Sequence, residues 1–177
     1  LDLSKLEAGA VQAVQEEFAI RDTLVFIETQ FAPLARAKGI ELRIRATRAS
    51  IRSDPLLVQR VLLNLVANAI RYTDQGGVLV GCRKWGERLR IAVWDTGCGI
   101  PDDRRDDVFR EFVQLDPERP HTSGIEKALG RGLGLGLAIV SRMADLLGTR
   151  IELESRLGIG SMFAFESTST DLAPGDR

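Results

Sequence analysis

The sequence predicts an α+β fold, a two-layer sandwich in which helices pack against one sheet. Most of the expected strands occur as hairpin partners, whereas a doubly wound parallel sheet would alternate strand and helix strictly. Segments with helical spacing of apolar residues lie between these strands. With 177 residues, of which 44% are hydrophobic and 28% charged, the chain is long enough for one domain with a hydrophobic core.

The first elements are predicted from the spacing of apolar residues. Residues 1–9 carry leucines at rough helical spacing and are expected to be the end of a helix. A short apolar run at 18–20 is expected as a strand. Helical spacing over 22–38, ended by Gly39, predicts a helix. Strict alternation of apolar and polar residues over 40–46 predicts a half-buried strand.

A polar cap followed by proline at 53–55 predicts the start of a second helix, which extends to about residue 72. A glycine-containing turn at 73–77 separates this helix from two strands, at 78–85 and 89–94. The short connection between these strands predicts a β-hairpin.

Residues 95–130 have weak periodicity, and only a short helix at 102–112 is expected within them. A long irregular segment inside a compact domain is typically functional or disordered. The remaining expected elements are a helix at 133–147, strands at 150–154 and 161–166, and a polar linker-like tail from Ser167.

The charge balance and the cysteines exclude several classes of protein. With 24 Lys and Arg against 25 Asp and Glu, the net charge of −1 argues against a nucleic-acid-binding protein. Cys82 and Cys98 are too few for a disulfide framework and form no CxxC pair for zinc, so reduced thiols in a cytoplasmic protein are expected. The longest apolar runs fall short of the ~20 residues that span a bilayer. Because the chain begins with Leu1 instead of Met, we expect a piece of a longer protein, and any membrane anchor would lie outside this piece.

The second helix carries the first group of candidate functional residues. Asn64, Asn68 and Arg71 are spaced i, i+4 and i+7 and share a face away from the apolar stripe. Asparagine is a poor helix former, so two of them in mid-helix suggest a role beyond folding, although a solvated face is the plain alternative. Amide oxygens suit Mg²⁺, and a basic side chain one turn further on can hold a phosphate.

The second candidate group directly follows a predicted strand. Asp95 stands at the strand end, where a buried carboxylate needs a hydrogen-bond donor. Gly97 and Gly99 allow close approach of the backbone to a neighbour or a positive φ. An ordinary turn would show the same short pattern, so this group alone is weakly specific.

Alternating glycines open the last predicted helix. Gly132, Gly134 and Gly136 each cost a helix roughly 1 kcal/mol relative to alanine. Bare amides that point at an anion on the helix N-terminus would explain them, and Arg131 adds positive charge. Glycines that pack beneath a sheet are the alternative. The pattern is neither a Rossmann fingerprint nor a P-loop.

Taken together, in this order and spacing, the motifs resemble those of sensor histidine kinases over almost the whole chain. Residues 64–73 resemble the N box, 95–100 the G1 box, 109–112 the F box, 132–139 the G2 box, 158–163 the final glycine turn and 1–9 the end of the dimerisation helix. The resemblance implies the Bergerat ATP-binding fold of the GHKL superfamily, a mixed, mostly antiparallel sheet with helices on one face. It divides the chain into a helix stump at 1–9, a catalytic ATP-binding domain at 10–168 with a flexible lid at about 101–131, and a linker or tail at 169–177.

The same resemblance implies roles for single residues towards ATP and Mg²⁺. Asn68 would bind Mg²⁺, and Asn64 would lie near the phosphates, where related ATPases carry a glutamate base. Arg71 would pair with phosphate and Tyr72 would lie beside the nucleotide. Asp95 would accept a hydrogen bond from the adenine 6-amino group, which predicts preference for ATP over GTP.

Further nucleotide contacts are implied on the loops. The glycines after Asp95 would let the base approach, the phenylalanines would pack the lid, and amides of the glycine-rich turn would reach the phosphates; these residues are Gly97, Gly99, Ile100, Phe109, Phe112, Gly132, Leu133, Gly134, Leu135 and Gly136. Lys127 and Arg131 are alternative contacts of the γ-phosphate, and the sequence does not choose between them.

The implied activity is that of a protein-histidine kinase in a two-component system. The γ-phosphoryl group would pass to a histidine on a dimerisation domain outside this chain, and then to an aspartate of a response regulator receiver domain; the parent protein would be a homodimer. His121 lies in the lid between Pro120 and Thr122 and is not expected to be the acceptor, so the chain alone should bind Mg·ATP without autophosphorylation. Alternatives are a GHKL-type ATPase of the gyrase, chaperone or MutL kind, a serine kinase for an anti-sigma partner, and a degenerate nucleotide-sensing interaction module.

Overall fold

A computed structural model describes residues 12–45, 47–110 and 136–171 of the chain. The elements in chain order are β1 (Glu16–Ala19), α2 (Ile20–Lys38), β2 (Glu41–Ile44), β3 (Ser50–Ser53), α3 (Pro55–Tyr72), β4 (Gly77–Trp85), β5 (Arg88–Asp95), the 3-10 helices η1 (Asp102–Arg104) and η2 (Asp107–Phe109), α5 (Gly136–Leu146), β6 (Glu152–Arg156) and β7 (Gly160–Ser169). None of the helices in these ranges is both long and apolar enough to cross a membrane.

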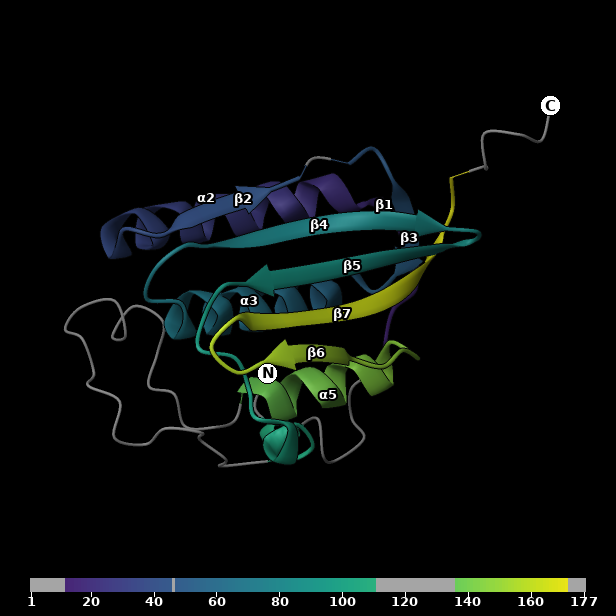
Figure 1. Cartoon of the computed structure of the whole chain (residues 1–177). Helices are drawn as coiled ribbons and strands as arrows, with labels where there is room; N and C mark the ends of the chain where they lie inside the picture. The colour runs from purple at the N-terminus through teal and green to yellow at the C-terminus, as the bar shows by residue number, and fades with distance from the viewer. Residues whose placement is uncertain (1–11, 46, 111–135, 172–177) are drawn as a thin grey trace.

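The strands form one mixed sheet with the order β1-β3-β7-β5-β4-β2, and β6 pairs with β7 (Figure 1). Only β2 and β4 are parallel among the described pairs; the others are antiparallel. Helices α2 and α3 lie behind the sheet in Figure 1, and α5 packs against α3. The predicted α+β two-layer sandwich, with a mostly antiparallel sheet, is therefore confirmed.

The hydrophobic core lies between the helices and one face of the sheet. Along β5, Leu89, Ile91 and Val93 are buried in this core. Their neighbours point to the other face, where Ala92 joins a small separate cluster and Trp94 is exposed. This alternation follows from the two-residue repeat of a strand that has helices on one side only.

The ends of α2 and α3 carry the local signals that the sequence predicts. Gly39 adopts the left-handed conformation at φ 74° and its amide donates to the carbonyls of the last turn of α2. Asp54 caps α3, since its Oδ1 accepts from Leu56 N and Leu57 N at 2.9 Å each. The other oxygen, Oδ2, accepts from Val14 N at 2.8 Å and so ties the segment before β1 to the start of α3.

Several predicted strand limits differ from the structure. The strand predicted at 18–20 is only partly found, because β1 ends at Ala19 and α2 begins at Ile20. Strand β3 was not predicted, since four residues with one buried isoleucine show no alternation. Strand β6 begins two residues later than predicted. Strand β7 continues through Ser169, so Ser167 belongs to the sheet and not to a tail.

The prediction of one helix over 102–112 is wrong for the described residues 102–110. The structure has the two 3-10 helices η1 and η2 there, and Arg110 is extended at φ −82° and ψ 151°. Side chains three residues apart eclipse in a 3-10 turn. Arg105 pairs with Asp102 at 2.6 Å and Arg110 with Asp107 at 3.1 Å, and both pairs have this spacing.

Candidate functional site

The C-terminal half of α3 contacts both the loop after β5 and the first described residue of α5, at one end of the central strands. Gly136, the first described residue of α5, lies opposite the two asparagines of α3. A methyl group on Gly136 would lie 3.5 Å from Asn64 Oδ1 and 3.5 Å from Asn68 Nδ2. The structure therefore brings the last glycine of the predicted phosphate-binding turn against both predicted ligands of Mg²⁺ and phosphate.

Asn64 is held in place by α3 itself. Asn64 Nδ2 donates to Arg60 O at 2.9 Å, one turn back along the helix. This bond uses a donor of the amide and leaves the carboxamide oxygen on the side of Gly136. Both asparagines are half-buried, as are Arg71 and Tyr72 in the last turn. The predicted common face of α3 is thus a partly enclosed polar surface that faces another element.

Asp95 ends β5 and points back at its own loop. Its Oδ1 accepts from Gly97 N at 2.8 Å and from Ser161 N at 3.3 Å. Burial raises the pKa of the Asp95 carboxyl, and the two backbone hydrogen bonds oppose this shift. Among the described residues, no hydrogen bond reaches Oδ2. Asp95 therefore has one oxygen anchored by backbone amides and one oxygen, Oδ2, that no described donor reaches.

The glycines after Asp95 are required by close contacts. A methyl group on Gly97 would overlap Tyr72 O and would lie 2.9 Å from Asp95 Oδ1. Gly99 has φ +70°, and a methyl group there would overlap Arg156 O. These glycines let the loop after β5 lie directly on the end of α3 and on the turn after β6.

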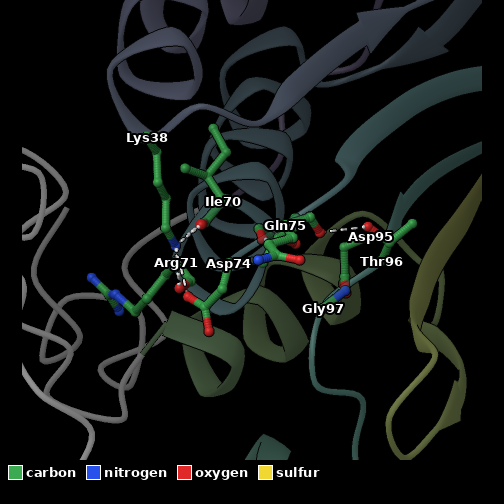
Figure 2. A network of polar contacts seen from close by, with 10 residues as sticks. Lys38, Ile70, Arg71, Asp74, Gln75, Asp95, Thr96 and Gly97 are labelled. Atoms are coloured by element: carbon green, nitrogen blue, oxygen red, sulfur yellow. Dashed lines mark hydrogen bonds and ion pairs between the residues drawn. The ribbon is translucent and has the colours of Figure 1, made fainter.

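A polar network joins this loop to the end of α3 (Figure 2). Cys98 N donates to Tyr72 O at 3.3 Å. Thr96 Oγ1 accepts from Gly77 N at 3.0 Å and donates to Gln75 O at 3.1 Å. The loop is thus bonded to the helix at one point and to the following turn at another.

Two serines that the sequence analysis did not single out as functional support the same loop. Ile100 N donates to Ser155 Oγ at 2.8 Å, and Ser155 Oγ lies 2.9 Å from Ser161 Oγ. The register of the sheet pairs Asp95 with Ser161, which explains the Ser161 amide on the Asp95 carboxylate. No local signal marks these serines, because their role depends on pairing between distant strands.

The start of the predicted lid is anchored to the sheet. Phe109 contacts Phe163 of β7 edge to face, with ring centroids 6.3 Å apart. The remaining predicted residues of the lid and of the glycine-rich turn, and the lid histidine, lie outside the described residues. They are Phe112, His121, Lys127, Arg131, Gly132, Leu133, Gly134 and Leu135.

The described residues offer no cluster of three His, Cys, Asp or Glu side chains that could hold a metal ion. A cation at this site would therefore depend on neutral amide oxygens and on the phosphates of a ligand. Such a ligand set suits Mg²⁺, which prefers oxygen and commonly binds through substrate phosphates. The asparagine pair beside Gly136 fits this requirement.

The fold and this site define an ATP-binding domain, and comparison with known proteins agrees. Residues 53–170 match the family described as histidine kinase-, DNA gyrase B-, and HSP90-like ATPase. The match covers more than half of the chain, and the chain belongs to this family. Within the family it is a catalytic domain of the histidine kinase type.

Curated relatives are sensor kinases of greater length. An uncharacterized sensor-like histidine kinase of Rhizobium meliloti (strain 1021) is 36% identical over 180 residues, which cover 100% of this chain and 33% of the relative. The sensor histidine kinase RcsC of Escherichia coli (strain K12) is 32% identical over 166 residues, which cover 92% of this chain and 17% of RcsC. The chain therefore spans only a third or less of these two relatives.

Solved structures show the same fold. Full-length ShkA in complex with AMPPNP superposes with a TM-score of 0.80 at 32% identity, over 97% of this chain and 35% of that chain. The catalytic domain of the histidine kinase ThkA in a nucleotide-free form superposes with a TM-score of 0.71 at 24% identity, over 88% of this chain and 95% of that chain. The second likeness supports the fold alone.

Proposed function

We propose that this domain binds Mg·ATP and, in its parent protein, donates the γ-phosphoryl group to a histidine of a dimerisation domain. A response regulator receiver domain would then accept the phosphoryl group on an aspartate, and the parent would act as a homodimer. The observation that carries the proposal is the proximity of Gly136 to the carboxamides of Asn64 and Asn68, each 3.5 Å from where a methyl group on Gly136 would lie. It places the first described residue of α5 against two neutral carboxamides, and amide oxygens are ligands that suit Mg²⁺.

The adenine base belongs at the β5 end of the site. Asp95 Oδ1 is occupied by two backbone amides, so Oδ2 is the oxygen that accepts the adenine 6-amino group. The 6-oxo group of guanine would face the same carboxylate as an acceptor, so ATP is preferred over GTP. Gly97, Gly99 and the buried Ile100 form the loop beside the base.

The phosphates belong at the α3–α5 end. Asn68 holds Mg²⁺ through its amide oxygen, Asn64 lies near the phosphates and Arg71 pairs with a phosphate. Bound Mg²⁺ neutralises charge on the phosphoryl group that is transferred. Asn64 cannot act as a general base, which suits a kinase, because activation of water would divert the phosphoryl group to hydrolysis.

The remaining contacts rest on the sequence resemblance. The glycine-rich turn supplies amides to the phosphates, and Tyr72 lies beside the nucleotide. Phe109 and Phe112 pack the lid, and Lys127 or Arg131 contacts the γ-phosphate.

Isothermal titration with AMPPNP tests nucleotide binding directly. We expect Mg²⁺-dependent binding, weaker binding of a GTP analogue, and loss of affinity in Asn68→Ala. Gln30→Ala is the matched control, because it removes an amide from an exposed position of α2 and should not change affinity. Absence of binding by the wild-type domain would favour a degenerate interaction module.

Labelled ATP tests the phosphotransfer. The isolated domain should acquire no label, and addition of a dimerisation domain with its histidine should produce labelled histidine on that partner. Label on His121 would contradict the proposal. Steady release of phosphate without a partner would favour a GHKL-type ATPase instead.

A further inference from the structure

We propose that Lys38 is a positioning residue for nucleotide binding. Its ammonium group donates hydrogen bonds to carbonyls in the last turn of α3, and the loop after Asp95 is bonded to the same turn. The inference rests on the proposed nucleotide-binding function. Lys38 is the last residue of α2 and touches neither the asparagine pair nor Asp95 in any described contact.

The end of α3 needs such a group. An α-helix leaves its last four carbonyls without partners inside the helix. Thr73, at the C-cap, is extended at φ −103° and ψ 113°, so α3 has no left-handed glycine cap of its own. The four carbonyls find other donors: Ala69 O accepts from Thr73 Oγ1 at 2.7 Å, Ile70 O and Arg71 O accept from Lys38 Nζ at 2.6 and 2.8 Å, and Tyr72 O accepts from Cys98 N at 3.3 Å.

Lys38 supplies two of these four bonds from a different helix (Figure 2). Its side chain is only 17% exposed, and its ammonium group also pairs with Asp74 at 3.7 Å. A positive charge at a helix C-terminus complements the helix dipole, and charged donors make the stronger hydrogen bonds. One ammonium group thus secures the last turn of α3 and the turn that follows it.

Both of these segments carry the nucleotide site. The fourth carbonyl, Tyr72 O, receives the Cys98 amide, and Gly97 lies so close to it that no side chain fits. The turn held through Asp74 continues to Gln75, whose carbonyl accepts from Thr96 Oγ1. The loop that presents Asp95 is therefore placed from two sides by backbone that Lys38 holds.

Loss of the ammonium group would have a defined effect. It would leave Ile70 O and Arg71 O without their donor and would loosen the turn that bears the Arg71 side chain. The separation between the phosphate end and the adenine end of the site would then vary. A ligand that spans both ends should lose more affinity than a ligand that occupies one end.

The test compares Lys38→Met with Arg36→Met. Lys38→Met keeps the aliphatic stem and removes the donors, whereas Arg36 is an exposed cation in the same last turn of α2. At a temperature well below the unfolding midpoint, we expect Lys38→Met to bind Mg·AMPPNP about tenfold more weakly than wild type. The affinity of Lys38→Met for adenosine, titrated by NMR, should fall by a smaller factor than its affinity for AMPPNP. Arg36→Met should bind as wild type does, and Lys38→Arg should recover part of the loss.

Hydrogen exchange gives an independent readout. The Cys98 amide should exchange faster in Lys38→Met, while amides within the β4–β5 pairing should be unchanged. A folded Lys38→Met domain with AMPPNP affinity within twofold of wild type, or with equal losses for AMPPNP and adenosine, would overturn the inference. If Lys38→Met does not fold, Lys38→Gln replaces it, because the glutamine NH2 group still donates hydrogen bonds but carries no charge; the same two results would overturn the inference. Failure of the wild-type domain to bind AMPPNP would instead overturn the proposed function, before any variant is compared.

Discussion

Substitution of Gly97 by alanine is the sharpest test of how the site is assembled. The added methyl group would overlap Tyr72 O and would lie 2.9 Å from Asp95 Oδ1. Gly97 is not among the glycines with positive φ, so the cost is steric and does not come from backbone conformation. Tyr72 O is main chain at the end of α3, so the clash cannot be relieved by a rotamer change. The loop must move away from the helix.

The magnitude follows from what this movement breaks. The bond from Cys98 N to Tyr72 O, at 3.3 Å, crosses the contact that has to open, and the bond from Gly97 N to Asp95 Oδ1, at 2.8 Å, joins Gly97 to a carboxylate that the added methyl group would crowd. Together with the strain of overpacking, their loss should lower the free energy of unfolding by about 2–4 kcal/mol. For a domain of this size the melting temperature should fall by roughly 4–16 °C. Nucleotide affinity should fall by about tenfold or more, because Asp95 loses the amide that orients it.

Urea unfolding and titration with AMPPNP measure the two effects. Gly86→Ala is the control, since Gly86 has φ +57° and nothing lies within 4 Å of the added methyl group. Its left-handed conformation should cost about 1–2 kcal/mol without any change in affinity. A Gly97→Ala domain with wild-type unfolding and wild-type affinity would refute the close contact between the loop and α3.

Asp95→Asn should lower ATP affinity roughly 10- to 100-fold through loss of a charge-assisted bond, measured by titration calorimetry, without loss of stability in urea. Burial raises the pKa of Asp95 in the folded state, so protonation of this carboxyl stabilises the folded domain. The gain in the free energy of unfolding is fully present below the ordinary aspartate pKa and is lost as pH rises through the folded-state pKa. ATP affinity should fall on acidification, because the ionised carboxylate is the proposed acceptor, and the fall should begin at a higher pH than for an aspartate with an ordinary pKa. An ATP affinity that stays constant down to the ordinary aspartate pKa would contradict this. Asp54→Ala removes the acceptor of three backbone amides and should lower the free energy of unfolding in urea by about 2 kcal/mol, whereas Asp22→Ala, at an exposed position in the first turn of α2, should lower it by less than about 0.5 kcal/mol. Burial raises the pKa of the Cys82 thiol to about 12, so iodoacetamide at pH 8 should alkylate the exposed Cys98 and spare Cys82, as peptide mass spectrometry would show; comparable labelling of both thiols would contradict the burial of Cys82.

Elements with local causes were predictable from the sequence. Helix α3 begins at its Asp54 cap, because the capping bonds join residues two and three positions apart. Helix α2 ends at Gly39 for a similarly local reason. The β4–β5 hairpin was predicted because its two strands are joined by a short turn at Gly86.

Elements with distant causes were not predictable. Strand β3 exists because Ile51 is buried and pairs with Ser169, 118 positions further along the chain by the register of the sheet. The same pairing draws the polar residues after Glu166 into β7 instead of a tail. Pairing between such distant segments depends on the packing of the whole sheet, which a local pattern does not contain.

The sequence by itself determined the components of the candidate site: Asn64 and Asn68 on one helix face, Asp95 at a strand end, and the glycines of two turns. Each of these follows from the repeat of a helix or a strand, or from a motif a few residues long. Only the tertiary structure decided how the components meet. Gly136 lies against the asparagine amides, Ser161 donates to Asp95, and Lys38 binds a carbonyl 33 residues away. These contacts exist because the helices and the sheet bury their apolar faces together, and that packing brings their polar ends to one end of the central strands.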